Sequence, residues 1–320
     1  MARLYPYLRE ISSPVTADQL QPLAPECRTV QFCEPLTDND HVKVAYLLRG
    51  YPAVALRVYG HRSQGHDLDF LRHYPDVRKI SVDLYNLTDV SALEQFASPE
   101  LESLAFGRTK SKTHSLAFLR RFRHLKSLYI EGHTKDIDTI GTLNRLEDLT
   151  LRSITLPDLS SLKPLKGLLS LDIKLGGTKN LGLLPEIGRL RYLELWLIRG
   201  LADVGPIGDI RTLQYLFLQA LKNIKEIPPL ARLRNLRRVY LETMKGLADL
   251  GPVAEAPALE DIVVVDMPHL QPLDFRAFVG HPTLRNARIG LGSFRKNRAV
   301  ADLLGVPDVI PKFRFRDATD

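Results

Sequence analysis

The sequence predicts a curved α/β solenoid, in which short repeated units stack on one another and their strands form a parallel sheet on the concave face. Three segments show the repeat most clearly: residues 189–210, 211–232 and 235–256. In each, a leucine is followed three and five positions later by two more apolar residues, and successive leucines are 23 residues apart. A unit of this size cannot bury its own apolar face, so it must stack on its neighbours.

The same pattern extends from residue 53 to residue 289 in eleven units, with steps of 21 to 25 residues. The first apolar positions of the units are Ala53, Val77, Leu101, Leu125, Leu146, Leu168, Leu190, Leu213, Leu236, Leu259 and Leu284. The fourth and sixth positions of every unit are also apolar. Because side chains alternate along a strand, we expect these two positions to point into the core.

The second half of each unit predicts the convex side of the solenoid. Pro206, Pro229 and Pro252 occupy the outer turns, where few residues remain before the next strand. A long helix does not fit there, so we expect short 3₁₀ or extended segments. Residues 90–97, 115–122 and 272–279 are the exceptions, since their apolar residues have helical spacing.

Residues 1–50 and 291–320 lie outside the repeat, and we interpret them as terminal caps that cover its open ends. In the first cap, we expect a strand near 29–32 and a helix that starts after Thr37 and ends at Gly50. In the second, we expect a helix from Ser293 to Gly305, and the alternating residues 312–317 predict an edge strand.

Composition narrows the class of protein. The 320 residues carry a net charge of +7, and only two are cysteines, Cys27 and Cys33. Two cysteines do not make a disulfide framework, which favours a reducing compartment. The first residues contain no apolar run typical of a signal peptide, and no run is long enough to span a membrane. We therefore expect a cytoplasmic protein.

The outer segments have the form (Leu/Ile)-x-(Asp/Glu)-(Val/Leu/Ile)-x-Pro-(Leu/Ile/Val), and the strands the form LxxLxL. Together they resemble the short repeat of bacterial internalin-like leucine-rich-repeat proteins over residues 53–290. The resemblance implies an arc with a parallel sheet on its concave side, and a role in binding macromolecules without catalysis. The internalin secretion signal and wall-sorting tail are not found in this sequence, so the family's role in surface invasion is not carried over.

One column departs from the family pattern. The ninth position of the repeat usually holds an asparagine that satisfies backbone groups in the turn. Here the column reads Tyr85, Thr109, His133, Ile154, Gly176, Ile198, Leu221, Met244 and Met267. We therefore expect the backbone groups of these turns to bond to one another or to water, because burying them unpaired would cost about 1–3 kcal/mol each.

Positions three, five and seven of each unit should point out of the concave sheet. In three adjacent units these positions hold five large aromatic side chains, including the only tryptophan. The predicted partner-binding residues are Tyr192, Glu194, Trp196, Tyr215, Phe217, Arg238, Tyr240 and Glu242. Exposed aromatic clusters are typical of binding surfaces. Two alternatives are that the rings merely suit a sheet, or that a cap folds back and buries them.

A row of basic residues precedes the strands and predicts a basic rim. Its members are Arg123, Arg145, Lys166, Arg189, Arg211 and Arg234. Such a row suits nucleic acid or an acidic protein. The alternative is a solvated rim whose long side chains cover apolar edges. Acidic residues on the concave face, such as Asp172 and Glu194, disfavour phosphate there, so bound nucleic acid should lie on the rim.

The sequence contains no phosphate-binding glycine loop, no HExxH motif, no CxxC pair and no nucleophile elbow. We therefore predict a monomeric, non-enzymatic scaffold for a protein partner, without cofactor or metal. Its role would be that of an immunity protein, a regulatory subunit or an effector. The alternative is a nucleic-acid-associated module that uses the basic rim.

Overall fold

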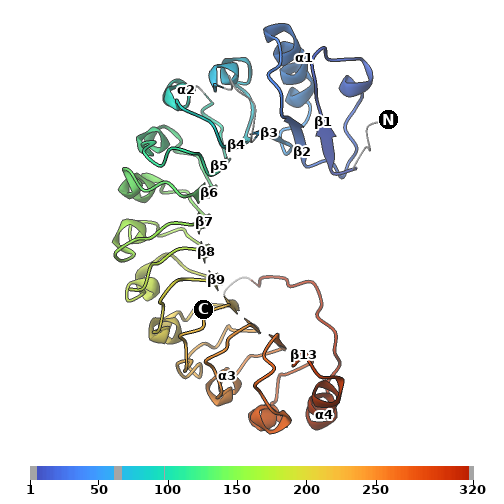
Figure 1. Ribbon diagram of the computed structural model, residues 1–320, viewed down its shortest axis with the longest axis vertical. Helices are drawn as coiled ribbons and strands as arrows, with labels where there is room; N and C mark the ends of the chain where they lie inside the picture. Colours follow the sequence, from blue (N-terminus) through green and yellow to red (C-terminus); the bar gives the residue numbers. More distant parts are fainter. Residues whose placement is uncertain (1–5, 61–66, 97, 317–320) are drawn as a thin grey trace. The chain divides into compact units, whose positions relative to one another are not determined.

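A computed structural model describes residues 6–60, 67–96 and 98–316. Within these residues, thirteen parallel strands follow one another in chain order in one open sheet. Between them, mostly short helical segments lie on the other side of each repeat from the strands (Figure 1). The chain divides into two compact units, residues 1–149 and 150–320. The predicted α/β solenoid with a parallel sheet is therefore confirmed.

The strands begin and end at nearly the same repeat positions throughout. Those that start in the first unit are β1 (Leu8–Glu10), β2 (Thr29–Phe32), β3 (Ala55–Gly60), β4 (Lys79–Leu84), β5 (Ser103–Phe106), β6 (Ser127–Glu131) and β7 (Asp148–Arg152). Those of the second are β8 (Ser170–Lys174), β9 (Tyr192–Trp196), β10 (Tyr215–Gln219), β11 (Arg238–Glu242), β12 (Asp261–Val265) and β13 (Asn286–Gly290).

Residues at equivalent positions of successive repeats are paired in the sheet. Leu193 pairs with Leu216, which pairs in turn with Val239, so equivalent positions of successive units are neighbours. All three side chains are fully buried, as predicted for the fourth position. In the first unit of the repeat, Leu56 and Val58 pair with Ile80 and Val82 as the spacing predicts, but Ala53 at the first position is exposed and the neighbouring Val54 is buried instead. Leucine at successive core positions forms a continuous apolar column.

The outer side is built mainly of short 3₁₀ segments, as predicted from the prolines. These are η1 (Asp18–Leu20), η2 (Asp69–His73), η3 (Ala117–Arg121), η4 (Ile137–Thr142), η5 (Ser160–Leu162), η6 (Leu184–Glu186), η7 (Gly205–Asp209) and η8 (Pro272–Phe278). Two short α-helices, α2 (Ser91–Gln95) and α3 (Gly251–Ala254), share this side. Of the three segments with helical spacing, 90–97 contains α2, whereas 115–122 and 272–279 form 3₁₀ turns.

Both terminal helices begin and end at the predicted residues. Helix α1 (Asp38–Arg49) starts after Thr37, whose side chain accepts a hydrogen bond from the Asp40 amide, and Gly50 follows its last residue. Helix α4 (Phe294–Leu304) starts after Ser293, which caps it in the same way, and ends at a left-handed Gly305. Capping side chains satisfy amides that have no partner within the helix.

The edge strand expected at 312–317 is wrong for the residues that the structure describes there, while Asp317 lies outside them. Residues 306–316 belong to no helix or strand. After α4 they return along the second unit toward β10 (Figure 1). We refer to residues 306–316 as the C-terminal tail.

In the second unit, where the asparagine column is missing, backbone groups of the turns form hydrogen bonds with one another. The residue before the ninth position is left-handed in each of six turns: Ser153, Leu175, Leu197, Ala220, Thr243 and Asp266. The amide of Leu197 donates to the carbonyl of Gln219, the last residue of the next strand, and Ala220 donates equivalently to Glu242. The ninth position is then free to hold buried apolar residues such as Leu221. The expectation that turn backbone groups bond to one another is confirmed here.

Candidate interaction surface

The aromatic residues predicted on the sheet face lie on adjacent strands of the second unit. The rings of Phe217 on β10 and Tyr240 on β11 are paired in the sheet and stack at 4.4 Å between centroids. Both are half-buried, although they lie on the face opposite to the leucine core. A stacked pair of this kind offers a rigid apolar surface.

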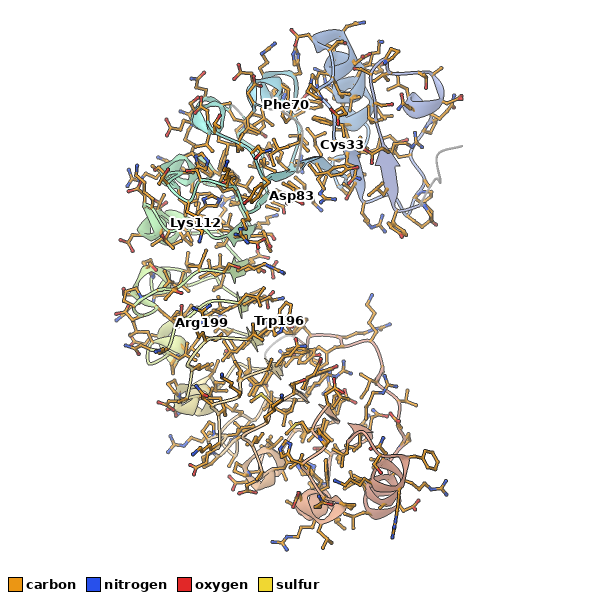
Figure 2. All side chains as sticks on the ribbon, viewed as in Figure 1. Cys33, Phe70, Asp83, Lys112, Trp196 and Arg199 are labelled. Atoms are coloured by element: carbon orange, nitrogen blue, oxygen red, sulfur yellow. The ribbon has the colours of Figure 1, made fainter. Side chains whose placement is uncertain are left out.

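Trp196 on β9 extends this surface by one strand. It pairs in register with Gln219 of β10 and is half-buried. Its side chain lies on the strand side of the repeats (Figure 2). The guanidinium group of Arg152 lies 5.7 Å from the centre of its ring, within the range of a cation–π contact. This contact supports the ring from the side of β7 and leaves part of it exposed.

A charged cluster borders the aromatic residues on strands β8 and β9. The Lys174 ammonium lies 3.0 Å from the Glu194 carboxylate and 3.5 Å from that of Asp172. Burial raises the pKa of Asp172 to about 6, against the opposing effect of Lys174. Burial also raises the pKa of Tyr192, whose hydroxyl donates to Glu194 at 2.8 Å. The cluster is therefore held by internal contacts.

The C-terminal tail covers the part of the sheet face nearest the N-terminal ends of the strands, which we call the strand entrances. The ring of Phe313 lies 5.1 Å from that of Tyr215, and the guanidinium groups of Arg237 and Arg238 each lie 5.0 Å from the Phe313 ring. Tyr215 in turn meets the ring of Tyr192 edge to face at 5.1 Å. The tail thus buries one end of the predicted patch against its own phenylalanine.

Arg238 was expected on the open surface, but the structure buries it, leaving 4% of it exposed. Its guanidinium group donates to Asp261 at 2.7 and 3.0 Å and to the carbonyl of Pro311 at 2.8 Å. A buried ion pair needs such additional hydrogen bonds to compensate for desolvation. While the tail is bound, Arg238 is therefore unavailable to a partner.

All six members of the predicted basic rim are exposed: Arg123, Arg145, Lys166, Arg189, Arg211 and Arg234. Arg145 contacts the His124 ring nitrogen at 3.1 Å, and Lys166 donates to the Glu186 carbonyl at 3.3 Å. The solvated rim that the sequence left open as an alternative agrees with this exposure.

Solved structures with a similar fold come from repeat proteins. An internalin (inlF) from Listeria monocytogenes str. 4b F2365 matches 84% of this chain and 83% of its own, with 16% identity and a TM-score of 0.55. A TLR13–ssRNA13 complex matches 89% of this chain and 46% of the TLR13 chain, with 17% identity and a TM-score of 0.55. The chain has a leucine-rich-repeat fold. No protein-family model and no curated protein sequence matches it.

The sequence did not reveal how this leucine-rich-repeat protein covers its own sheet face. The alternating residues 312–316 resembled a strand, and the partners that hold them are far away in the chain, at Gln214 and Arg237. The available signal was polar residues at the second position of consecutive units, at the entrance of each strand. Such residues, when buried, require a partner.

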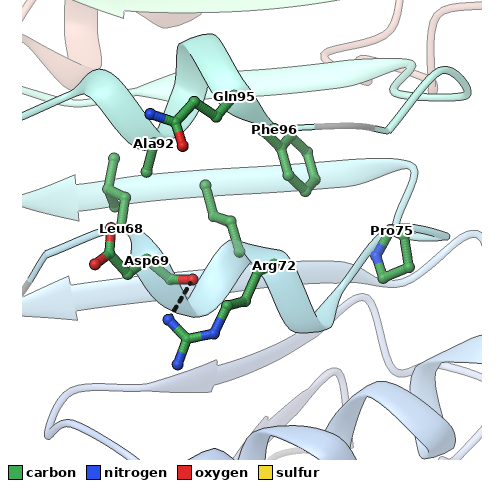
Figure 3. A pocket seen from close by; sticks show the side chains of 8 residues that line it. Leu68, Asp69, Arg72, Pro75, Ala92, Gln95 and Phe96 are labelled. Atoms are coloured by element: carbon green, nitrogen blue, oxygen red, sulfur yellow. Dashed lines mark hydrogen bonds between the residues drawn. The ribbon is translucent and has the colours of Figure 1, made fainter.

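The first unit contains a separate cavity of about 440 Å³ on the side of the 3₁₀ segments. It lies between η2 and α2 and is lined by Leu68, Asp69, Leu71, Arg72, Pro75, Ala92, Gln95 and Phe96 (Figure 3). Arg72 is already engaged there, because it donates to the Asp69 carbonyl and to the carboxylate of Asp38. Its mixed lining does not bring together a set of catalytic groups.

Within residues 6–60, 67–96 and 98–316, no three or more histidine, cysteine, aspartate or glutamate side chains are grouped so that they could hold a metal ion. The same residues include no helix with the length and apolarity needed to cross a membrane. The buried His133 is instead hydrogen-bonded to the Gly107 carbonyl at 3.2 Å, in the column where the family places asparagine.

Proposed function

We propose that this leucine-rich-repeat protein is a non-enzymatic scaffold that binds a protein partner. The docking surface is the part of the sheet face that the C-terminal tail leaves open. It consists of Trp196, Phe217 and Tyr240, flanked by Glu194 and Glu242. The observation that carries the proposal is the row of three half-buried rings on the adjacent strands β9, β10 and β11.

Energetic considerations favour a binding role for these rings. The core beneath the sheet is already filled by leucines such as Leu216 and Leu218, which are fully buried. The rings on the opposite face therefore add little to that core while leaving apolar surface in contact with water. Large aromatic side chains bury much area for few rotatable bonds, which is why they dominate binding hot spots.

The remaining predicted residues have a supporting place in this proposal. Tyr192, Tyr215 and Arg238 pack beneath or beside the tail and set the boundary of the open surface. Gln219 donates to Glu242 at 2.7 Å and orders the polar margin on the other side. An immunity, regulatory or effector role would use such a surface in the same way.

The test is affinity capture from an extract of the native host, followed by titration calorimetry with the captured partner. Trp196→Ala and Phe217→Ala should each weaken binding by about 2 kcal/mol or more, with little change in thermal midpoint. The matched control is Phe294→Ala, which removes a ring that is 83% exposed on α4, outside the surface. Lower stability with unchanged affinity would assign the two rings to packing and refute the proposal.

A salt titration separates this function from binding at the basic rim. Binding centred on aromatic contacts should change little between low and high salt. Binding to phosphates should weaken steeply, because bound counterions are released. Steep salt dependence together with an unchanged affinity of Trp196→Ala would contradict the proposed surface.

A further inference from the structure

The C-terminal tail is fixed to the entrance of the strands by buried side chains. The Gln214 side chain forms two hydrogen bonds with the backbone of Arg316, at 2.7 and 2.8 Å. Arg237 donates twice to the carbonyl of Arg314, each time at 3.1 Å. Gln214 and Arg237 are only 3% and 8% exposed. The tail therefore has a specific binding position on the sheet, and its own side chains project from that position.

The docked tail and the sheet line an open basic pocket of about 450 Å³. Six cationic side chains and two carboxylates line it: Arg237, Arg238, Arg285, Lys312, Arg314 and Arg316, with Glu260 and Asp261. Glu260 already pairs with Arg237 at 3.3 Å and with Arg316 at 2.8 Å. Asp261 pairs with the buried Arg238 at 2.7 Å. Both carboxylates are therefore occupied, and positive charge remains in excess.

Arg316 is exposed but paired with Glu260, and three further cations are exposed: Arg285, Lys312 and Arg314. No described carboxylate forms an ion pair with any of the three. Exposed guanidinium groups with free donors are well suited to phosphate oxygens. The tail thus adds cations at the same end of the strands where the basic rim lies.

The rim continues this charge along the second unit. Arg189, Arg211 and Arg234 are exposed just before β9, β10 and β11, and Asn235 donates to the Arg211 carbonyl, which links two successive rim segments. With strands about 4.8 Å apart, the charge from β9 to β13 extends over roughly 20 Å. We refer to these three arginines together with Arg285, Lys312, Arg314 and Arg316 as the basic strip.

An aromatic ring lies within the basic strip. Phe315 is 49% exposed and meets the ring of Phe313 edge to face at 5.0 Å, which holds it in place. An exposed ring between Arg314 and Arg316 suits a nucleobase, because bases stack on aromatic side chains while their phosphates contact cations. Bases of a duplex are already stacked on each other, so a single strand fits this arrangement better.

We propose that the basic strip binds single-stranded nucleic acid, with phosphates on Arg285, Lys312 and Arg314 and a base on Phe315. This site is separate from the aromatic surface proposed for the protein partner. Carboxylates on the open sheet face, such as Glu194 and Glu242, confine a polyanion to the strand entrances. An acidic peptide is less favoured, since its carboxylates leave the exposed Phe315 ring without a partner.

The test is fluorescence anisotropy with a labelled single-stranded RNA or DNA of twelve mixed nucleotides, measured at several salt concentrations. The double variant Lys312→Gln/Arg314→Gln should bind about tenfold more weakly, with a shallower salt dependence. The matched control, Lys222→Gln/Lys225→Gln, removes the same charge from exposed lysines outside the strip and should have little effect. Equal weakening by both double variants would reduce the binding to overall charge and overturn the proposal.

Two single variants test whether the Phe315 ring and the docked position of the tail contribute to nucleic-acid binding. Phe315→Ala removes only the ring, and Gln214→Ala releases the tail without changing any charge. Each should weaken oligonucleotide binding several-fold, whereas Trp196→Ala should leave it unchanged. Absence of oligonucleotide binding at low salt overturns the proposal. So does equal competition by poly-glutamate combined with an unchanged affinity of Phe315→Ala, which would assign the strip to acidic protein.

Discussion

Gln214 and Arg316, 102 residues apart in the chain, exchange two hydrogen bonds between one side chain and one backbone unit. The Gln214 side-chain Nε2 donates to the Arg316 backbone carbonyl at 2.7 Å, and the Arg316 backbone amide donates to the Gln214 side-chain Oε1 at 2.8 Å. The Gln214 side chain thereby offers the Arg316 backbone one donor and one acceptor, as a neighbouring strand would. This pair joins the end of the described tail to the entrance of β10.

Gln214→Ala should release the tail and lower the free energy of unfolding by about 1–3 kcal/mol, because two hydrogen bonds at a buried side chain are lost. Limited trypsin digestion should then cut sooner after Lys312 and Arg314. The control is Gln219→Ala at the other end of β10, which removes a hydrogen bond to Glu242 on β11 but does not touch the tail. Equal digestion rates in both variants would mean that Gln214 does not hold the tail.

Leu197 is left-handed, with φ of 49°, and its side chain is 48% exposed. A residue with a Cβ atom is strained in this region, whereas glycine is not. We expect Leu197→Gly to be more stable than Leu197→Ala by about 0.5–1 kcal/mol, because both lose the exposed atoms beyond Cβ and only glycine also loses the Cβ atom that causes the strain. Chemical denaturation of the two variants measures the difference. A glycine variant less stable than the alanine variant would show that chain entropy outweighs the strain.

The periodicity of apolar residues predicted the strands and their register, because each unit buries the same two positions against its neighbours. Leu193 and Leu216 are found where the 23-residue spacing places them. In the first repeat unit the buried residue before the strand is Val54 and not Ala53, because spacing alone does not tell which of two adjacent apolar residues is buried. Local capping signals were sufficient for the two terminal helices.

The course of the tail was not predictable from the same signals. Alternation in residues 312–316 is compatible with a strand, and a propensity for extended backbone does not say which surface it contacts. Its position depends on Gln214, Arg237 and Arg238, which look like ordinary polar residues of a strand entrance. Long-range polar pairing of this kind leaves no periodic trace in a sequence. The sequence therefore indicated the strands that carry the aromatic rings, but not how much of their sheet face the tail covers.

Leu216→Ala tests the register on which both proposed sites depend. Leu216 is fully buried on β10, between Tyr215 and Phe217 on the opposite face. The substitution should cost about 2–5 kcal/mol of unfolding free energy, because it leaves a cavity in a packed core. Thermal and denaturant unfolding measure the cost. Val309→Ala, at a residue that is 56% exposed, is the control and should change stability by less than about 1 kcal/mol.

The buried carboxyl group of Asp172 makes the free energy of unfolding depend on pH. Burial raises the pKa of its carboxyl from 3.8 to about 6, while Lys174 opposes this shift and Glu194 adds to it. A carboxyl whose pKa is higher in the folded state stabilises the fold below its unfolded pKa, and this contribution is lost as the pH rises through 6.

Asp172→Asn removes the titration and keeps the shape of the side chain. Thr150 donates a hydrogen bond to the native carboxylate at 3.0 Å, and the amide oxygen of asparagine accepts the same bond. The stability of the variant relative to the wild type should therefore increase by on the order of 2 kcal/mol between pH 4 and pH 7. Denaturant unfolding at four pH values across this window measures the difference. A difference that stays constant with pH would mean that Asp172 titrates alike in the folded and unfolded protein, and one that falls with pH would reverse the sign argued from its burial.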